Sequence, residues 1–235
     1  METVRLPEGF RLSVVMPVYN ERATIERILQ RLKDTGLPCE LLVVDDGSRD
    51  GTRELLQQLA GEGGFRLLLQ ERNQGKGAAV RRGLMEATGD VVVIQDADLE
   101  YDPQDLRGLV QAIVADEADV VYGTRFGHSD RPVSPGWHRQ GNALITWMSN
   151  VRTGLKLTDV ETCYKMFRRE IIAPIAPTLR ERGFGIELEI TAKVARVPGV
   201  RIVERPISYA RRTYAEGKKI GMRDAFWALW CLIRY

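Results

Sequence analysis

The stretch Val91-Val92-Val93-Ile94-Gln95-Asp96-Ala97-Asp98-Leu99-Glu100 decides the fold of this chain. Its four β-branched residues are typical of a short strand that is buried on both faces. Asp96 and Asp98 follow directly, and on an extended backbone their side chains point the same way. Because open α/β sheets bind ligands at the carboxyl ends of their strands, the pair is a candidate site for a hard divalent cation that also holds phosphate oxygens. The alternative is a surface turn, in which Asp is also common.

Strand and helix patterns alternate on both sides of this stretch and predict an α/β fold. The expected strands lie at 12–18, 41–44, 66–71, 91–94, 119–122, 159–167 and 200–204, and the expected helices at 25–32, 55–59, 78–87, 106–113, 137–153, 186–195 and from 220. This order, with short loops, indicates a mostly parallel sheet with helices on both faces. Right-handed crossovers bring the carboxyl ends of parallel strands to one edge. We therefore expect Tyr19, Asp46 and the pair Asp96/Asp98 to converge.

Length and composition are those of a globular protein with one large α/β domain. The chain has 235 residues, of which 44% are hydrophobic and 28% charged, so a single domain over 1–235 is expected. A net charge of +2 gives no indication of a nucleic-acid partner. Cys39, Cys163 and Cys231 have no metal-type spacing and no signal peptide is visible, so a reducing cytoplasm is the expected setting. No apolar run reaches about 18 residues, which predicts no membrane-spanning helix.

Two further strand ends carry groups suited to a nucleotide. The loop Gly75-Lys76-Gly77 precedes a helix, where backbone N–H groups and the helix dipole can hold a phosphate. It lacks the spacing of a Walker loop, and an ordinary glycine turn is the alternative. Asp46 ends the second expected strand, where its carboxylate can accept a hydrogen bond from a base imide or a ribose hydroxyl.

Five motifs, taken in order, resemble family 2 glycosyltransferases. They are Val14-Val15-Met16-Pro17-Val18-Tyr19-Asn20-Glu21, Val43-Val44-Asp45-Asp46-Gly47-Ser48-Arg49-Asp50-Gly51-Thr52, Asn73-Gln74-Gly75-Lys76-Gly77, Asp96-Ala97-Asp98-Leu99 and Gly123-Thr124-Arg125. They are most similar to the branch of dolichyl-phosphate mannose synthase and the polyprenyl-phosphate glycosyltransferases, over about residues 11–220. The resemblance implies a GT-A fold in which 11–125 bind the nucleotide-sugar, 126–219 bind the acceptor and 220–235 form an amphipathic helix.

The resemblance also implies a nucleotide-sugar donor, GDP- or UDP-hexose, together with Mg²⁺ or Mn²⁺. The implied nucleotide pocket consists of Pro17, Tyr19, Glu21, Val44 and Asp46, and the implied metal and diphosphate site of Asp96, Ala97 and Asp98. Further positions that the resemblance assigns to phosphate are Lys76, Arg125, Arg139, Arg212 and Lys218. Glu100 stands where the family often has Gln near the metal, which adds a candidate third carboxylate ligand.

The implied reaction displaces a nucleoside diphosphate from the sugar with inversion. Asp98 and Arg212 are the candidates for stabilising the negative charge that develops on the leaving phosphate. A lipid-phosphate acceptor is already anionic and needs no base, whereas a hydroxyl acceptor requires a carboxylate to take its proton. Asp159 is the candidate for that acceptor-side role, with Glu187 behind it, and a cap or turn residue is the alternative for Asp159. A non-catalytic module that binds a nucleotide-sugar is a further alternative, whereas a nucleotidyltransferase lacks its expected glycine-rich amino-terminal loop here.

The carboxyl-terminal segment has the pattern of an amphipathic helix. Its apolar stripe consists of Met222, Phe226, Leu229, Trp230 and Ile233, with Trp227 beside it and Arg223 and Arg234 flanking it. Trp and basic residues suit a membrane interface, and such a helix can lie in the headgroup plane. The alternative is a helix packed on the core or in a dimer. We expect a protein peripheral to the cytoplasmic face of a membrane, with the oligomeric state left open.

Overall fold

The computed structural model describes residues 6–126, 136–212 and 222–235, and within these ranges seven strands form one sheet. In order across the sheet they are β3 (Arg66–Leu69), β2 (Cys39–Asp45), β1 (Leu12–Val18), β4 (Val91–Ile94), β6 (Lys165–Arg168), β5 (Val120–Thr124) and β7 (Ile202–Pro206). β6 runs antiparallel to both of its neighbours, and the other adjacent strands pair in parallel. The predicted mostly parallel α/β sheet is therefore confirmed.

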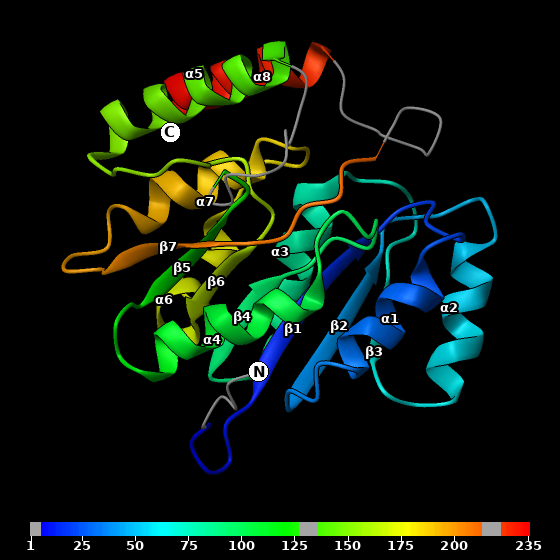
Figure 1. The fold of residues 1–235 in the computed structure, drawn as a ribbon. Helices are drawn as coiled ribbons and strands as arrows, with labels where there is room; N and C mark the ends of the chain where they lie inside the picture. Colours follow the sequence, from blue (N-terminus) through cyan, green and yellow to red (C-terminus); the bar gives the residue numbers. More distant parts are fainter. Residues whose placement is uncertain (1–5, 127–135, 213–221) are drawn as a thin grey trace.

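Helices cover both faces of this sheet (Figure 1). They are α1 (Ile25–Lys33), α2 (Thr52–Gly61), α3 (Lys76–Glu86), α4 (Leu106–Val114), α5 (Gly136–Thr153), α6 (Arg169–Ile172), α7 (Ile186–Val194) and α8 (Met222–Arg234), with 3₁₀ turns η1 (Pro103–Asp105) and η2 (Ala176–Thr178). α3 lies very close to the sheet, because a Cβ at its Gly83 would overlap the side chain of Val15. This close packing fixes the first residue of α3, Lys76, at the edge of the sheet.

β4 carries the acidic stretch to the edge of the sheet. Its four residues are buried, as the apolar run predicts. Its hydrogen bonding to β1 continues for one more residue, because the N–H of Gln95 donates to the carbonyl of Val15 at 3.0 Å. The Gln95 side chain in turn accepts a hydrogen bond of 2.6 Å from the hydroxyl of Tyr164. Asp96 is thus the first residue beyond the ordered ladder.

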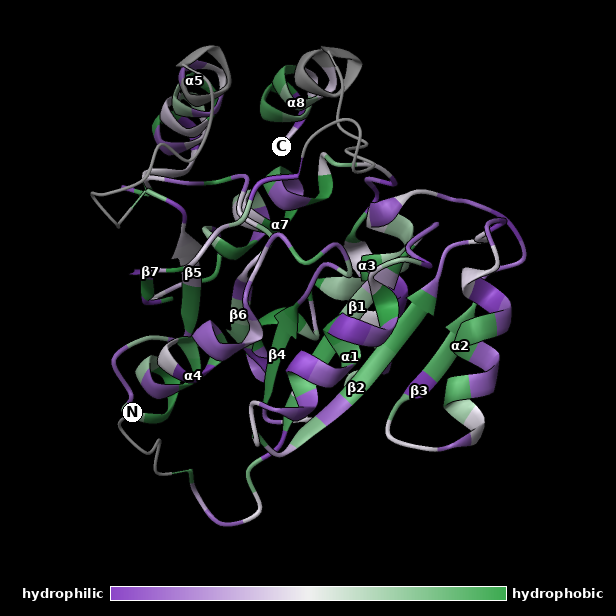
Figure 2. Ribbon diagram, turned by 45° about the vertical axis from the view of Figure 1, so that its right-hand side comes forward, coloured by the Kyte–Doolittle hydropathy of each residue, from purple (hydrophilic) through white to green (hydrophobic). Residues whose placement is uncertain are grey.

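An outer layer of two helices, α5 and α8, lies beyond α7. The two helices lie side by side in both views, and α7 contacts each of them (Figures 1 and 2). Because α7 is covered by the sheet on one side and by the outer helices on the other, it is buried almost all round. Its buried carboxylates Glu187 and Glu189 are paired with Lys76 and Lys193, each at 2.8 Å.

The predicted strand at 159–167 is wrong over most of its length, because the ladder begins only at Lys165. The N–H groups of Thr158 and Asp159 both donate to the carboxylate of Glu204 on β7, at 2.8 and 3.1 Å. The Glu204 side chain therefore accepts hydrogen bonds from backbone N–H groups that would pair with a neighbouring strand in a regular sheet.

The loop that precedes β6 is also held by hydrogen bonds from the buried ammonium group of Lys165. Lys165 donates to the carbonyl oxygens of Val160, at 2.9 Å, and Thr162. The hydroxyl of Tyr101 accepts a hydrogen bond from the N–H of Cys163 at 3.1 Å. The loop before β6 is thus shaped by side chains and not by a strand ladder.

The predicted amphipathic helix at the carboxyl end is present as α8. Ala228, Cys231 and Leu232 form its buried face and Tyr235 directly after it is also buried, whereas the stripe residues Trp230 and Ile233 are exposed. One face of the helix therefore packs on the protein and the other does not. Among the described residues, none of the helices combines the length and the hydropathy needed to cross a bilayer.

Candidate active site

The acidic turn after β4 contains three carboxylates with different partners. Asp96 accepts a 2.9 Å hydrogen bond from Lys76, whereas Glu100 accepts from the hydroxyl of Tyr209 at 2.8 Å. Between them, Oδ1 of Asp98 accepts the N–H of Glu100 at 3.0 Å, and no described residue donates to its Oδ2. The turn passes through Leu99 at a φ of 65°, a conformation that non-glycine residues rarely adopt. This conformation of Leu99 directs the N–H group of Glu100 toward the carboxylate of Asp98.

The electrostatics of this turn favour a bound cation. Burial, followed by the negative charges of Asp96 and Glu100, raises the pKa of Asp98 to about 7. Within the described ranges the acidic groups do not form a ready cage of three ligands. Mg²⁺ typically uses only one or two carboxylates and completes its shell with water and substrate phosphates. The donor set at Asp98 therefore fits such a cation.

Arg212 closes the acidic turn from the other end of the chain. Its backbone N–H donates to Glu100 at 2.7 Å. Its guanidinium forms a forked pair with Glu21, at 3.1 and 2.9 Å, just after β1. Two residues that the resemblance assigns to different parts of the donor are thus in direct contact.

Asp46 holds the glycine loop. Its carboxylate is buried and accepts the N–H groups of Gln74 and Gly75, at 2.7 and 2.8 Å, and the side-chain amide of Gln70 at 2.8 Å. These bonds occupy the oxygens that the sequence suggests for a base or ribose. In this structure the contact made by Asp46 is with the loop that presents Lys76.

Lys76 links the sheet edge to α7. Its ammonium group contacts Asp96 at 2.9 Å and Glu187 at 2.8 Å, and it lies 5.8 Å from the centre of the Phe184 ring. Although burial favours the neutral amine, the two carboxylates hold the pKa of Lys76 well above its ordinary value. The second oxygen of Glu187 is buried and has no partner among the described residues.

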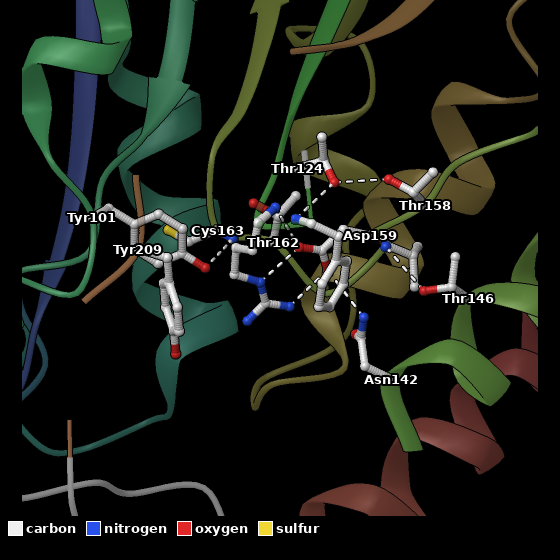
Figure 3. Close-up of polar contacts among 12 residues, drawn as sticks. Tyr101, Thr124, Asn142, Thr146, Thr158, Asp159, Thr162, Cys163 and Tyr209 are labelled. Atoms are coloured by element: carbon white, nitrogen blue, oxygen red, sulfur yellow. Dashed lines mark hydrogen bonds and ion pairs between the residues drawn. The ribbon is translucent and has the colours of Figure 1, made fainter. Parts of the chain in front are cut away.

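Asp159 is buried and forms an ion pair with Arg125, and Figure 3 shows Asp159 with its neighbour Asn142. The guanidinium donates to both carboxylate oxygens, each at 2.6 Å, and Asn142 of α5 points toward the same carboxylate. Arg125 also lies 5.2 Å from the centre of the Tyr209 ring. Tyr209 therefore touches both the acidic turn and this pair, which makes the two parts one site.

Glu161, two residues after Asp159, is a further candidate residue that sequence reasoning did not single out. Burial raises the pKa of its carboxyl to about 7, against the opposing effect of Arg125. No described residue donates a hydrogen bond to it. The sequence offered one indication of Glu161, namely its position between the candidate Asp159 and Thr162 within the expected strand 159–167.

The remaining candidate residues lie around the same edge. Pro17 and Tyr19 are half-buried at the end of β1, Val44 is buried in β2, and Ala97 is buried between the two Asp residues. Arg139 lies in α5, but its side chain is outside the described part of the structure, as is Lys218 altogether. Two of the strand ends that were expected to converge are connected, since Asp46 binds the loop whose Lys76 pairs with Asp96.

The fold is that of an α/β protein with an acidic turn at the carboxyl edge of its sheet, and comparison with known proteins identifies the family. Residues 13–175 match the model of glycosyl transferase family 2. The chain is 31% identical over 220 residues to the undecaprenyl-phosphate mannosyltransferase of Micrococcus luteus, covering 90% of this chain and 88% of the relative. It is 31% identical over 218 residues to the undecaprenyl-phosphate 4-deoxy-4-formamido-L-arabinose transferase of Pseudomonas aeruginosa, of whose length it spans 61%. The chain belongs to glycosyl transferase family 2 and is a glycosyltransferase.

Solved structures confirm the GT-A-like fold. The glucosyl-3-phosphoglycerate synthase of Mycobacterium tuberculosis superposes with a TM-score of 0.71 at 22% identity, over 96% of this chain and 80% of the synthase. The same synthase in complex with Mn²⁺, UDP and glucosyl-3-phosphoglycerate superposes with a TM-score of 0.64 at 23% identity, over 88% of this chain and 75% of the synthase. At this level of identity the likeness concerns the fold alone.

Proposed function

We propose that this glycosyltransferase moves a hexose from a nucleoside-diphosphate sugar to a polyprenyl phosphate, with inversion at the anomeric carbon. The observation that carries the donor half is the pair of cations beside the acidic turn, where the Lys76 ammonium group pairs with Asp96 and the Arg212 guanidinium pairs with Glu21. Cations held in place by carboxylates are suited to stabilise the charge that develops on a leaving diphosphate. We place the base of the nucleotide against Pro17, Tyr19 and Val44 at the ends of β1 and β2.

We further propose that Asp98 holds Mg²⁺ or Mn²⁺, with Asp96 or Glu100 as a second carboxylate. The Oδ2 atom of Asp98, to which no described residue donates, and the raised pKa of Asp98 support this assignment. The bound cation would supply charge neutralisation to the diphosphate. The role of Lys76 is then to keep Asp96 ionised and oriented.

The acceptor class rests on the named relatives and on the state of Asp159. The mannosyltransferase of M. luteus, matched over 88% of its length, is named for undecaprenyl phosphate. Asp159 is occupied by Arg125, so it is not a free base in this structure. A phosphate acceptor is already nucleophilic and needs none. Arg125 would instead orient that phosphate, through the part of its guanidinium that faces away from Asp159.

One observation favours a second candidate, transfer to a hydroxyl group. A general base works best when its pKa lies near the operating pH. Burial raises the pKa of Glu161 to about 7, and its carboxylate is not hydrogen-bonded by the described residues. In that candidate function Glu161, not Asp159, would take the proton of the acceptor.

We also propose that the outer face of α5 and α8 lies on a membrane surface. Large exposed apolar side chains repeat along both helices: Leu144, Trp147 and Val151 on α5, and Trp227, Trp230 and Ile233 on α8. Their spacing puts each set on one side of its helix. Exposed patches of this kind mark interaction sites, and Trp suits the bilayer interface. The face would hold the enzyme where a polyprenyl acceptor resides.

The test is an assay of GDP- and UDP-hexoses with undecaprenyl phosphate in vesicles, with and without Mn²⁺. We expect a sugar-lipid product that depends on the cation and falls at least about a hundredfold in Asp98→Asn. Asp34→Asn, an exposed residue at the end of α1, is the matched control. Product formed equally well by Asp98→Asn would overturn the donor assignment.

The two acceptor classes are separated by Glu161→Gln. Transfer to a lipid phosphate should survive this substitution within a few-fold, because no proton has to be removed. Transfer to a hydroxyl should fall by about a hundredfold or more, because the base is lost. A sugar product formed without any lipid phosphate, and lost in Glu161→Gln, would establish the second candidate.

A further inference from the structure

The segment 181–187 lies directly against the glycine loop. The carbonyl of Arg182 accepts the N–H of Gly77 at 2.7 Å and that of Ala78 at 3.3 Å. A Cβ at Gly75 would overlap this same carbonyl, and a Cβ at Gly77 would overlap that of Glu181. No side chain fits between the two segments. A displacement of one backbone is therefore transmitted to the other.

The side chain of Glu181 joins the same segment to α8. Its buried carboxylate accepts one hydrogen bond from the indole N–H of Trp227 and one from the hydroxyl of Tyr235, each at 2.8 Å. Arg234 adds an ion pair at 3.6 Å. Trp227 and Arg234 of α8, and Tyr235 directly after it, thus converge on a single carboxylate in the segment that contacts the glycine loop.

A second contact runs through Gly185. A Cβ at this residue would overlap the sulfur of Cys231, so α8 lies against bare backbone immediately before α7. Two residues further on, Glu187 pairs with Lys76 at 2.8 Å. Both ends of the segment 181–187 therefore connect α8 with the lysine at the sheet edge.

We propose that Glu181 is a positioning residue that couples the packing of α8 to the position of Lys76 and of the glycine loop. Where it concerns donor binding, this inference rests on the proposed function, in which Lys76 keeps Asp96 ionised and oriented beside the donor diphosphate. When α8 is packed against Glu181 as in this structure, Glu181 holds the adjoining carbonyl of Arg182 in place. That carbonyl in turn holds the N–H groups of Gly77 and Ala78. When α8 is displaced, the loop loses this support.

The coupling gives the outer face of α8 a role in donor binding. Trp230 and Ile233 are exposed on the side that we assign to the membrane. Lipid contact that favours the seated helix must also favour the ordered loop, because both belong to one state. By reciprocity, donor binding must strengthen membrane binding by the same factor.

The direct test is amide hydrogen exchange at Gly77 and Ala78, measured without vesicles or donor. The double variant Trp227→Phe/Tyr235→Phe leaves Glu181 in place but removes the two hydrogen bonds that Trp227 of α8 and the adjoining Tyr235 donate to it. We expect exchange at these two amides to accelerate by about tenfold, with global stability retained. Trp230→Phe is the matched control, because it makes the same substitution on the same helix without a contact to Glu181.

Unchanged exchange in the double variant, or equal acceleration in the control, would overturn the proposal. A second readout separates it from the proposed function. In the wild type, vesicles should lower the KM for the donor several-fold, and in Glu181→Gln this effect should disappear while the KM for the acceptor stays unchanged. If no donor is turned over by the wild type, the proposed function fails, but the exchange result still decides the coupling.

Discussion

Asp159 is wholly buried beneath Arg125 and accepts two parallel hydrogen bonds from its guanidinium. The bonds join Nε to Oδ2 and Nη2 to Oδ1, each at 2.6 Å, and the Arg125 side chain keeps 16% of its surface exposed. A bidentate pair of this kind fixes the plane of the guanidinium as well as its position. The Asp159 carboxylate therefore orients the guanidinium of Arg125. Of the two side chains, only that of Arg125 remains partly exposed.

Removing the charge of Asp159 should destabilise the protein. Asp159→Asn leaves Arg125 with an uncompensated charge in a largely desolvated position, which typically costs about 3–5 kcal/mol. Urea denaturation should show this loss in the free energy of unfolding. The double variant Arg125→Ala/Asp159→Ala should lose less than the sum of the single variants, because the residues act as a pair. Unfolding midpoints equal to that of the wild type would contradict the pairing.

Glu161 should make stability depend on pH. Burial raises the pKa of its carboxyl to about 7 in the folded protein, against about 4.3 in the unfolded chain. Because the folded state binds this proton more tightly, the contribution of Glu161 is most favourable below about pH 4 and declines as the pH rises to about 7. Glu161→Gln abolishes the decline, so its stability relative to the wild type should increase by up to about 3 kcal/mol across that range.

The measurement is urea denaturation at a series of pH values. Glu26→Gln, an exposed position on α1, serves as the control and should run parallel to the wild type. A constant difference between Glu161→Gln and the wild type at every pH would show that the carboxyl titrates normally.

Gly77→Ala should weaken donor binding with little change in the rest of the fold. Gly77 has an ordinary φ, so the substitution tests only the space between the glycine loop and the Glu181 carbonyl. The loop must move to admit a Cβ, and we expect the KM for the donor to rise by about tenfold or more. Gly108→Ala is the matched control, because nothing lies within 4 Å of its added Cβ. Steady-state kinetics with equal donor KM in both variants would contradict the close contact.

Substitution of Trp147 and Trp230 should reduce membrane binding. Both indoles are exposed, on α5 and α8 respectively, and each would enter the interface if this face lies on the bilayer. We expect Trp147→Ala/Trp230→Ala to lower the partition coefficient to anionic vesicles by about tenfold or more in sedimentation assays. Met85→Ala, exposed on α3, should leave partitioning unchanged. Loss of binding in the control alone would place the membrane contact elsewhere.

Local patterns were sufficient to predict most of the fold. The apolar run 91–94 identified a central strand, because only a strand buried on both faces lacks polar residues on either side. The helix expected at 106–113 is likewise present as α4, with Leu106, Leu109 and Val110 on its buried side. In the site, the sequence analysis assigned Lys76 and Arg212 to phosphate, and both residues contact the acidic turn in the structure.

Contacts between distant residues explain what the patterns missed. The strand predicted at 159–167 was shortened by Glu204, a residue 45 positions beyond Asp159, whose carboxylate takes the backbone N–H groups. The hydrogen bond of Asp46 to the backbone of Gln74 likewise joins residues 28 positions apart, and no local pattern reports it. The raised pKa of Glu161 depends on burial in the finished fold, which no local pattern reports.

The hydrogen bonds of Arg212 to Glu100 and Glu21 also bear on how the protein is made. They tie the last part of the chain to strand ends formed from its first half. During synthesis from the amino terminus, the acidic turn emerges more than a hundred residues before the arginine that covers it. A ribosome-bound nascent chain that ends before β7 would therefore display carboxylates without this guanidinium, and catalytic competence would arrive late in translation.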